Sequence, residues 1–177
     1  MPTTIRALIL DCDGVLTDGA ITVDDHGTES RRFNVRDGFG IALWRSLGLG
    51  IAVISGRGGA SARHRLERLG VTDIVQGAPD KAAAVRDAAA RLATPLSDCA
   101  FVGDDWPDLP AMALVGYPIA VADATPEVRA AAAWTTTTPG GHGAVREAIE
   151  HILRAQGRLT DPASLAHVRG PATPART

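Results

Sequence analysis

The chain has 177 residues, of which 45% are hydrophobic and 21% charged, and its formal net charge is −2. This length suits one well-buried domain, and the near-neutral balance offers no basic field for nucleic acid or acidic lipid. No apolar run approaches the ~20 residues that cross a bilayer, so we expect a cytoplasmic protein with neither a membrane nor a nucleic-acid partner.

Short apolar runs alternate with longer amphipathic stretches along most of the chain. The apolar runs predict buried strands at 5–10, 51–54, 74–75, 100–102 and 119–121. The amphipathic stretches carry Ala, Leu, Arg and Glu at helical spacing and predict helices at 37–47, 59–69, 80–92, 109–115, 126–132 and 143–155. This alternation predicts an α/β fold with a Rossmann-like, doubly wound parallel sheet and helices on both faces.

One segment interrupts this alternation. The runs 20–24 and 28–35 are strand-like and are separated by Asp25-His26-Gly27, which predicts an antiparallel β-hairpin that projects from the sheet. From Arg158 onward the chain is rich in Pro, Ala, Gly and Arg without apolar periodicity. We therefore expect one domain over 1–157 and a flexible tail over 158–177.

The first apolar run ends in two carboxylates, Asp11 and Asp13, followed by Gly14. Residues i and i+2 of a strand share a face, and the glycine lets the chain turn so that both carboxylates can approach a ligand. Open α/β sheets bind ligands beyond the carboxyl ends of their strands. The pair therefore suits a nucleophile and its acid/base partner, although a polar turn after a buried strand is the alternative.

Two further polar positions open predicted helices. Ser55 is followed by a glycine-rich run at 56–59, and a hydroxyl with free backbone amides at a helix start suits a phosphate oxygen. Lys81 lies at the beginning of its helix, where its charge opposes the helix dipole. This mismatch indicates that Lys81 has a functional role. The plainer interpretations are a glycine-rich turn after Ser55 and a solvated side chain at Lys81.

Asp104, Asp105 and Asp108 follow the strand predicted at 100–102. Three carboxylates within five residues repel one another unless a cation balances them. Oxygen ligands of this kind favour Mg²⁺, whereas a helix start rich in Asp is the alternative. The only cysteines, Cys12 and Cys99, form no metal-like pattern with the histidines, so we expect free thiols and no zinc site.

Asp-x-Asp, Ser, Lys and Gly-Asp-Asp-x-x-Asp occur in this order at strand ends, and the pattern resembles the haloacid dehalogenase superfamily of phosphotransferases. The resemblance implies that Asp11 attacks phosphorus to form an aspartyl-phosphate. Asp13 would protonate the departing alcohol and then activate water. Ser55 and Lys81 would bind and neutralise the transferring phosphoryl group.

The same resemblance implies a magnesium site. Asp11, Asp104 and the main-chain carbonyl of Asp13 would hold Mg²⁺, and Asp108 would orient Lys81 or metal-bound water. An acid at position 13 separates the phosphatases of the superfamily from its dehalogenases, which lack the second carboxylate. The expected reaction is therefore hydrolysis of a phosphate ester.

At finer grain, the segments 33–40, 54–57, 102–105, 121–124 and 140–147 resemble the 3-deoxy-D-manno-octulosonate 8-phosphate phosphatase family. That family is tetrameric and acts on a phosphorylated eight-carbon keto-acid sugar, and the resemblance runs from Ile5 to about Leu159. Guanidinium groups suit recognition of the substrate carboxylate, and Arg36 could serve this purpose at a neighbouring subunit, whereas solvated arginines on a helix face are the plainer interpretation. The residues expected to contact substrate are Asn34, Arg36, Ser55, Gly56, Arg57 and Arg65. His142 stands where the family usually has arginine.

The spacing of the motifs bears on what covers the site. About 40 residues separate Asp13 from Ser55 and about 25 separate Ser55 from Lys81, too few for a cap domain beyond a hairpin. A small charged substrate would then face bulk water, so we expect a neighbouring subunit of a homotetramer to cover the site. Three alternatives are a phosphatase for nine-carbon ulosonate 9-phosphates, a receiver-like phosphoacceptor module and a catalytically silent scaffold.

Overall fold

The structure, a computed structural model, describes residues 2–159. Within them, a six-stranded parallel sheet has the strand order β5-β4-β1-β6-β7-β8, with β1 and β6 at its centre. The strands are β1 (Ala7–Leu10), β4 (Gly50–Ser55), β5 (Asp73–Gln76), β6 (Cys99–Gly103), β7 (Tyr117–Ala120) and β8 (Trp134–Thr135). The tail predicted at 158–177 falls, from position 160 on, outside the described residues.

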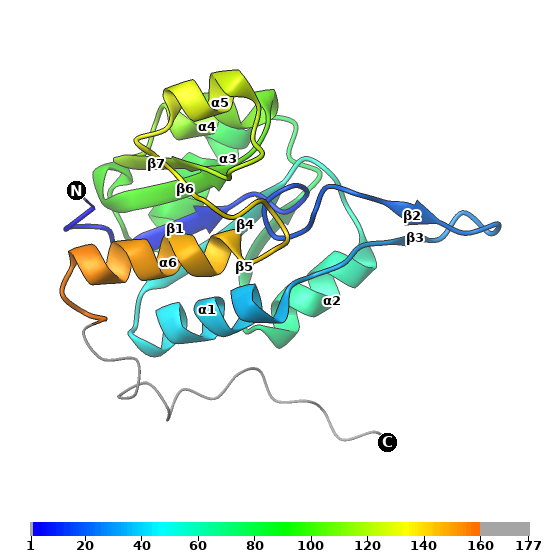
Figure 1. The fold of residues 1–177 in the computed structure, drawn as a ribbon, viewed down its shortest axis with the longest axis horizontal. Coiled ribbons are helices and arrows are strands. Elements are labelled where there is room, and N and C mark those ends of the chain that lie inside the picture. The colour runs from blue at the N-terminus through cyan, green and yellow to red at the C-terminus, as the bar shows by residue number, and fades with distance from the viewer. Residues whose placement is uncertain (1, 160–177) are drawn as a thin grey trace.

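Helices cover both faces of this sheet. The helices are α1 (Val35–Ser46), α2 (Ala60–Arg68), α3 (Lys81–Arg91), α4 (Leu109–Met112), α5 (Pro126–Ala131) and α6 (Ala144–Ala155), with single 3-10 turns η1 (Leu96–Asp98) and η2 (Trp106–Asp108). In Figure 1, α1, α2 and α6 lie on one side of the sheet and α3, α4 and α5 on the other. This arrangement confirms the predicted doubly wound α/β fold.

The core lies between the central strands and these helices. All four residues of β1 are fully buried, as expected for a strand with neighbours on both edges and helices on both faces. Trp44 on α1 and Phe101 on β6 are the largest fully buried side chains. Burial of each large apolar side chain stabilises the fold by roughly 1.5–3 kcal/mol.

None of the described helices is long and apolar enough to span a bilayer, and the cytoplasmic location stays a prediction.

The hairpin projects from the body as predicted, but its strands are short (Figure 1). β2 (Thr22–Val23) and β3 (Glu29–Ser30) have two residues each and pair antiparallel, with their side chains exposed. The predicted strand at 28–35 is wrong at its end, because α1 begins at Val35. Asn34 caps that helix by accepting a hydrogen bond from the backbone N–H of Arg36 at 2.8 Å, which fixes the helix start.

Two other boundaries differ from prediction. The edge strand β8 was missed, since its two half-buried residues form no apolar run and pair only with β7. The helix predicted at 109–115 ends at Met112, with a chain turn at Leu114 whose N–H bonds the carbonyl of Ala111. Pairing with a distant strand therefore defines β8, whereas a local turn ends α4 early.

Candidate active site

The carboxyl ends of the central strands meet at a cleft of ≈ 200 Å³. Asp11 follows β1, Ser55 ends β4, Lys81 begins α3, and Asp104 follows β6. The residues that line the cleft are Asp11, Asp13, Ser55, Gly56, Arg57, Lys81, Asp104, Asp105, Pro107 and Asp108. The structure thus brings together the four predicted catalytic residues and the carboxylates predicted to hold a metal.

The loop after β1 approaches the loop after β6 very closely. Gly14 has φ +99°, a left-handed conformation that favours glycine, and a Cβ there would collide with the carboxylate of Asp104. Cys12 lies buried between the two carboxylates of the motif, and burial, followed by the charges of Asp13 and Asp11, raises its pKa to about 12. Its thiol therefore stays protonated and does not compete with Asp11 as a nucleophile.

Lys81 lies between two buried carboxylates. Its Nζ donates to Oδ1 of Asp11 at 2.7 Å and to Oδ1 of Asp108 at 2.6 Å, and the three side chains are 9%, 5% and 1% exposed. Burial alone would lower the pKa of Lys81, but attraction to the two carboxylates outweighs it and the pKa is raised. The lysine is therefore a fixed cation that can face the oxygens of a phosphoryl group.

Asp108 is oriented from the backbone of its own loop. Its Oδ2 accepts from the N–H groups of Asp104 at 2.9 Å and Asp105 at 3.3 Å. A Cβ at Gly103 would lie 2.7 Å from this carboxylate, so the last residue of β6 must be small for Asp108 to reach its place. With both oxygens engaged, Asp108 supports Lys81, which is one of the two roles that the family resemblance implies for it.

Three carboxylates, those of Asp11, Asp104 and Asp108, have oxygens within 4.8 Å of one another. Burial and then the charges of Asp11 and Asp108 raise the pKa of Asp104 to about 8, while burial and Asp108 raise that of Asp11 to about 6. The single positive charge of Lys81 therefore does not balance the three carboxylates that meet in the cleft. An all-oxygen donor set with excess negative charge fits a hard divalent cation such as Mg²⁺.

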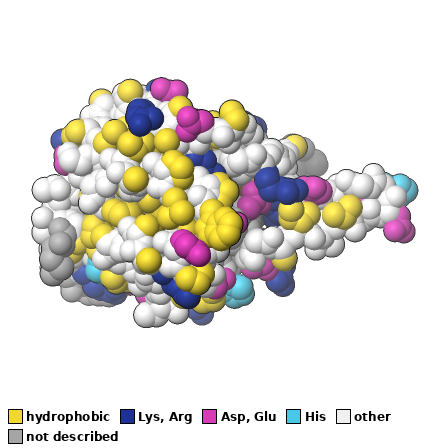
Figure 2. Space-filling model, turned by 90° about the horizontal axis from the view of Figure 1, so that it is seen from above, with side chains coloured by type: hydrophobic (Ala, Val, Ile, Leu, Met, Phe, Trp, Pro, Cys, Tyr) yellow, Lys and Arg dark blue, Asp and Glu magenta, His cyan; other side chains and the backbone are white. Residues whose placement is uncertain are grey.

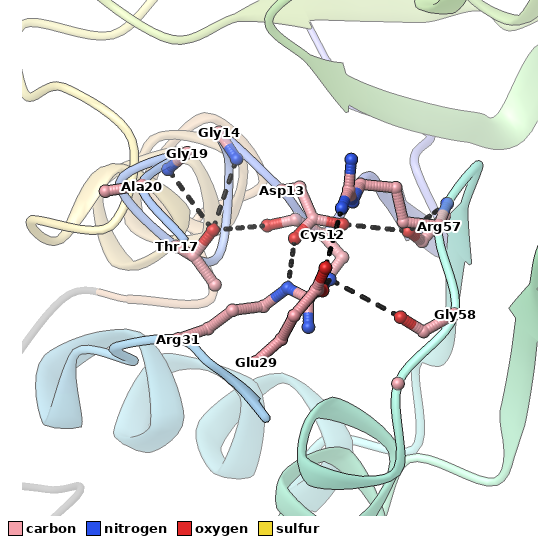
Figure 3. A network of polar contacts seen from close by, with 12 residues as sticks. Cys12, Asp13, Gly14, Thr17, Gly19, Ala20, Glu29, Arg31, Arg57 and Gly58 are labelled. Carbon is pink, nitrogen blue, oxygen red and sulfur yellow. Dashed lines mark hydrogen bonds and ion pairs between the residues drawn. The ribbon is translucent and has the colours of Figure 1, made fainter. Parts of the chain in front are cut away.

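The side chain of Asp13 lines the same cleft and has partners other than this cluster. Its Oδ2 accepts from the hydroxyl of Ser55 at 3.1 Å, and its Oδ1 accepts from Nε of Arg31 at 2.5 Å. Ser55 in turn accepts from the backbone N–H of Arg57 at 3.0 Å. Figure 3 shows the contact between Asp13 and Arg31. The predicted metal contact through the main-chain carbonyl of Asp13 stays a prediction.

Arg31 and Glu29 were missed by sequence reasoning. Both belong to the hairpin region, and Glu29 accepts from Arg31 at 3.5 Å and from Arg57 at 3.3 Å. In the sequence, Arg31 is one of two adjacent arginines, and nothing in that pair indicates which side chain points into the body. On the face seen in Figure 2, acidic and basic side chains gather where the hairpin leaves the body.

The residues predicted to contact substrate are spread more widely than the catalytic ones. Ser55, Gly56 and Arg57 line the cleft, while three other predicted contacts do not. Arg65 lies against Gly38 on α1, with its guanidinium 2.9 Å from where a Cβ of that glycine would be. Asn34 caps α1 and donates to the carbonyl of Gly141 at 3.4 Å, and Arg36 is exposed.

His142 lies on the loop that Asn34 contacts. Its Nδ1 is 2.7 Å from the carbonyl oxygen of Gly140, and the residue is exposed. Gly140 packs directly on the backbone of Gly14, where a side chain would collide with the Gly14 carbonyl. The histidine therefore lies beside a loop that supports the catalytic turn, but outside the residues that line the cleft.

Comparison with known proteins gives consistent matches. Residues 47–149 match the family of haloacid dehalogenase-like hydrolases. The chain is 43% identical over 157 residues to a 3-deoxy-D-manno-octulosonate 8-phosphate phosphatase of Escherichia coli K12, covering 89% of this chain and 84% of that one. It is also similar to a phosphatase of that name from Moraxella catarrhalis, whose crystal structure contains a magnesium ion, a phosphate ion and a KDO molecule. That match has 38% identity and a TM-score of 0.88, and it covers 95% of each chain.

A further solved structure is the cobalt-bound deoxy-D-mannose-octulosonate 8-phosphate phosphatase of Haemophilus influenzae. It is 38% identical to this chain with a TM-score of 0.88, over 92% of this chain and 96% of that one. Two relatives of the same fold therefore have solved structures with a bound metal, magnesium in one and cobalt in the other. The oxygen cluster of Asp11, Asp104 and Asp108 agrees with the chemistry that such an ion requires.

Proposed function

The chain belongs to the 3-deoxy-D-manno-octulosonate 8-phosphate phosphatase family of haloacid dehalogenase-like hydrolases, and on this premise we propose that it hydrolyses that eight-carbon sugar phosphate. The observation that carries the proposal is the meeting, at one cleft, of the Asp11–Lys81–Asp108 cluster with the Asp13–Ser55 pair. A buried cation beside one carboxylate and a second carboxylate in the same cleft suit transfer of a phosphoryl group to the first and of a proton from the second.

In the first step, an oxygen of Asp11 attacks phosphorus, and the bond between phosphorus and the sugar oxygen breaks. The contact from Lys81 holds Oδ1 of Asp11, which orients the carboxylate and places positive charge beside the transferring oxygens. The proton of the Asp13 carboxyl group passes to the departing sugar oxygen. The products of this step are the free sugar alcohol, an aspartyl-phosphate at position 11 and an ionised Asp13.

In the second step, Asp13 takes a proton from water as the water oxygen attacks phosphorus. The bond between Asp11 and phosphorus breaks, inorganic phosphate leaves, and both carboxyl groups return to their starting states. The hydroxyl of Ser55 and the backbone amide of Gly56 line the cleft at the start of the loop that leads to α2, where they can hold phosphoryl oxygens.

We assign the metal site to Asp11 and Asp104, with Asp108 beside them and the carbonyl of Asp13 as a further oxygen donor. Mg²⁺ bound there would neutralise charge on the phosphoryl oxygens. Asp104 follows β6 directly, and its pKa of about 8 reflects burial among other carboxylates rather than a proton that the reaction uses.

The substrate assignment is tested by phosphate release. With Mg²⁺, the purified protein is expected to release phosphate faster from 3-deoxy-D-manno-octulosonate 8-phosphate than from hexose phosphates. Asp11→Asn is expected to lower that rate by at least about 10³-fold, since the nucleophile is lost. A preference for a nine-carbon ulosonate 9-phosphate would overturn the substrate assignment alone. Full activity of the asparagine variant would overturn the mechanism.

We further propose that the protein is a homotetramer in which a neighbouring subunit covers the cleft. The cleft of ≈ 200 Å³ is smaller than the ~300–1,000 Å³ of typical ligand pockets, so most of a larger substrate would extend beyond it. Val23 on the hairpin, Val35 at the start of α1 and Trp106 beside the cleft are large apolar side chains that are 59%, 77% and 61% exposed. Size-exclusion chromatography with light scattering would give the mass of the oligomer. A monomer with full activity would overturn this proposal.

A further inference from the structure

Arg31 is a buried arginine contributed by an otherwise exposed hairpin. It directly follows β3, and its side chain is 2% exposed, whereas the neighbouring Arg32 side chain is 85% exposed. Its guanidinium contacts Oδ1 of Asp13 at 2.5 Å, the carbonyl of Gly58 at 3.4 Å and Glu29 at 3.5 Å. Figure 3 shows Arg31 reaching from the hairpin strand to Asp13. A guanidinium held on several sides and removed from water is fixed in place.

The two oxygens of Asp13 have unlike partners. Oδ1 contacts Arg31, while Oδ2 contacts the hydroxyl of Ser55. The hydroxyl hydrogen of a serine rotates freely, so Ser55 can turn from Oδ2 to a phosphoryl oxygen when a substrate enters. Arg31 has no comparable freedom. Entry of a phosphoryl group would therefore release Oδ2 and leave Oδ1 occupied.

Arginine also restricts where a proton can reside on Asp13. A guanidinium has only N–H donors and no acceptor, and it keeps its charge in proteins. If Oδ1 carried a proton on the side that faces Nε of Arg31, that proton would clash with the hydrogen that Nε donates. The contact thus excludes the proton from that position and favours the opposite oxygen, which lies on the side of Ser55.

We propose that Arg31 is a positioning residue that anchors Oδ1 of Asp13, so that Oδ2 alone exchanges the proton with the leaving sugar oxygen and then with water. This inference rests on the proposed function, in which Asp13 is the acid and base. When the ester bond breaks, the proton passes from Oδ2 to the sugar oxygen. When the aspartyl-phosphate is hydrolysed, Oδ2 takes a proton from the attacking water. The side chain of Arg31 then makes the hairpin a part of the catalytic site.

The test uses Arg31→Gln and esters that differ in their need for an acid. An alkyl ester such as a sugar phosphate needs a proton on its leaving oxygen, phenyl phosphate needs it less, and p-nitrophenyl phosphate needs it least because its leaving group is a stable anion. The ratio kcat/KM is measured because it reports only the steps up to release of the alcohol. The two aryl esters carry no sugar, so a loss of sugar contacts leaves their ratio unchanged.

We expect Arg31→Gln to lower kcat/KM by about 10- to 100-fold for the alkyl ester, by less for phenyl phosphate and least for p-nitrophenyl phosphate. Arg31→Lys, which retains a cationic donor, should recover much of the loss. Arg32→Gln is the matched control, because within residues 2–159 the exposed Arg32 side chain pairs with Asp18 alone, and it should leave all three values unchanged. Equal losses for the two aryl esters, or no loss at all, would overturn the inference.

Asp13→Asn serves as the reference, since it removes the acid itself. If Asp13→Asn shows the same dependence on leaving group and Arg31→Gln does not, only the role of Arg31 is wrong. If Asp13→Asn shows no such dependence, the acid role in the proposed function fails, and the role of Arg31 fails with it. Arg31→Met retains the buried aliphatic stem and replaces the glutamine variant if circular dichroism shows that the latter does not fold.

Discussion

The two ends of helix α3 each carry a cation paired with aspartate, and the two arrangements are opposite in character. At the first residue, Lys81 is buried between Asp11 and Asp108. At the last residue, Arg91 is half exposed and donates two hydrogen bonds to Asp73, at 3.0 and 2.7 Å. The arginine complements the negative end of the helix dipole, whereas the lysine faces the positive end.

The difference separates charge that serves stability from charge that serves a reaction. A pair whose cation is half exposed, such as Arg91–Asp73, contributes about 1 kcal/mol at most and disturbs little. A buried cluster loses its hydration, and attraction within it repays that loss only in part. The raised pKa values of Asp11 and Asp104 record this cost. An arrangement that stability alone would not favour is explained if a cation and a phosphoryl group complete it.

Removal of the buried cation should have the largest effect. Lys81→Met is expected to lower kcat/KM by about 10²–10³-fold, because the charge that faces the transferring phosphoryl group is lost. It should also destabilise the protein, since Asp11 and Asp108 are left without a counter-charge, at a cost of about 3–5 kcal/mol. Steady-state phosphate release and urea unfolding measure the two effects. Arg86→Met, at an exposed position of the same helix, is the control. Unchanged activity of Lys81→Met would refute the assigned role.

Asp104→Asn should separate metal binding from stability. The variant is expected to lose at least about 10-fold in Mg²⁺ affinity by calorimetry, because a charged ligand is replaced by a neutral one. In protein treated with chelator, Asp104 has a pKa of about 8 in the folded state, above its ordinary 3.8. Such a group favours the folded state at low pH, and the wild type should lose stability as pH rises from about 4 to about 8.

The asparagine variant lacks this titration, so its metal-free form should lose less stability over the same pH range. Thermal unfolding of both proteins at pH 5 and pH 8 with chelator present measures the difference. Asp105→Asn is the matched control, since Asp105 is exposed and lies outside the three-carboxylate cluster. If the stability of the wild type and that of Asp104→Asn depend on pH in the same way, ionisation of Asp104 within the cluster does not destabilise the fold.

The elements that position the site could be predicted because they carry strong local patterns. β1 and β6 are short apolar runs that are buried throughout, and Asp11 and Asp104 follow them directly. In a parallel sheet the carboxyl ends of neighbouring strands meet at one edge, so sequence position alone predicts that these side chains converge. Lys81 was predicted from its mismatch with the helix dipole, a signal that also depends only on local order.

The features that were missed depend on contacts between distant segments. Arg31 and Arg32 are alike in sequence, and only the path of the hairpin decides that the first is buried against Asp13 while the second is exposed. The edge strand β8 is defined by two pairings with β7 rather than by its own composition. The hairpin strands are shorter than the alternation of residues predicts, since the described residues provide no second layer for them.

A smaller effect is expected at the cap beside Lys81. Asp80 precedes the lysine, and its Oδ1 accepts from the backbone N–H of Ala83 at 3.0 Å, which caps the start of α3. Asp80→Ala should destabilise the protein by about 1 kcal/mol in urea unfolding. It should lower activity only slightly if the two carboxylates hold Lys81 in place. Asp87→Ala, at an exposed position in the middle of α3, is the control. A loss of activity comparable to that of Lys81→Met would mean that the helix start, and not the carboxylates, positions the lysine.

The smallest effect is expected at the far end of the helix. Arg91→Met should destabilise the protein by no more than about 1 kcal/mol and leave phosphate release unchanged, because the Arg91 side chain is half exposed and neither it nor Asp73 lines the cleft. The loss should shrink in 1 M salt, where exposed charges are screened within ~3 Å. Arg91→Lys, which keeps the charge but not the two-pronged contact, should fall between the wild type and Arg91→Met. A loss above about 2 kcal/mol that persists in salt would show that Arg91 acts through packing of its stem, and the contrast between the two ends of α3 would then no longer be one of exposure.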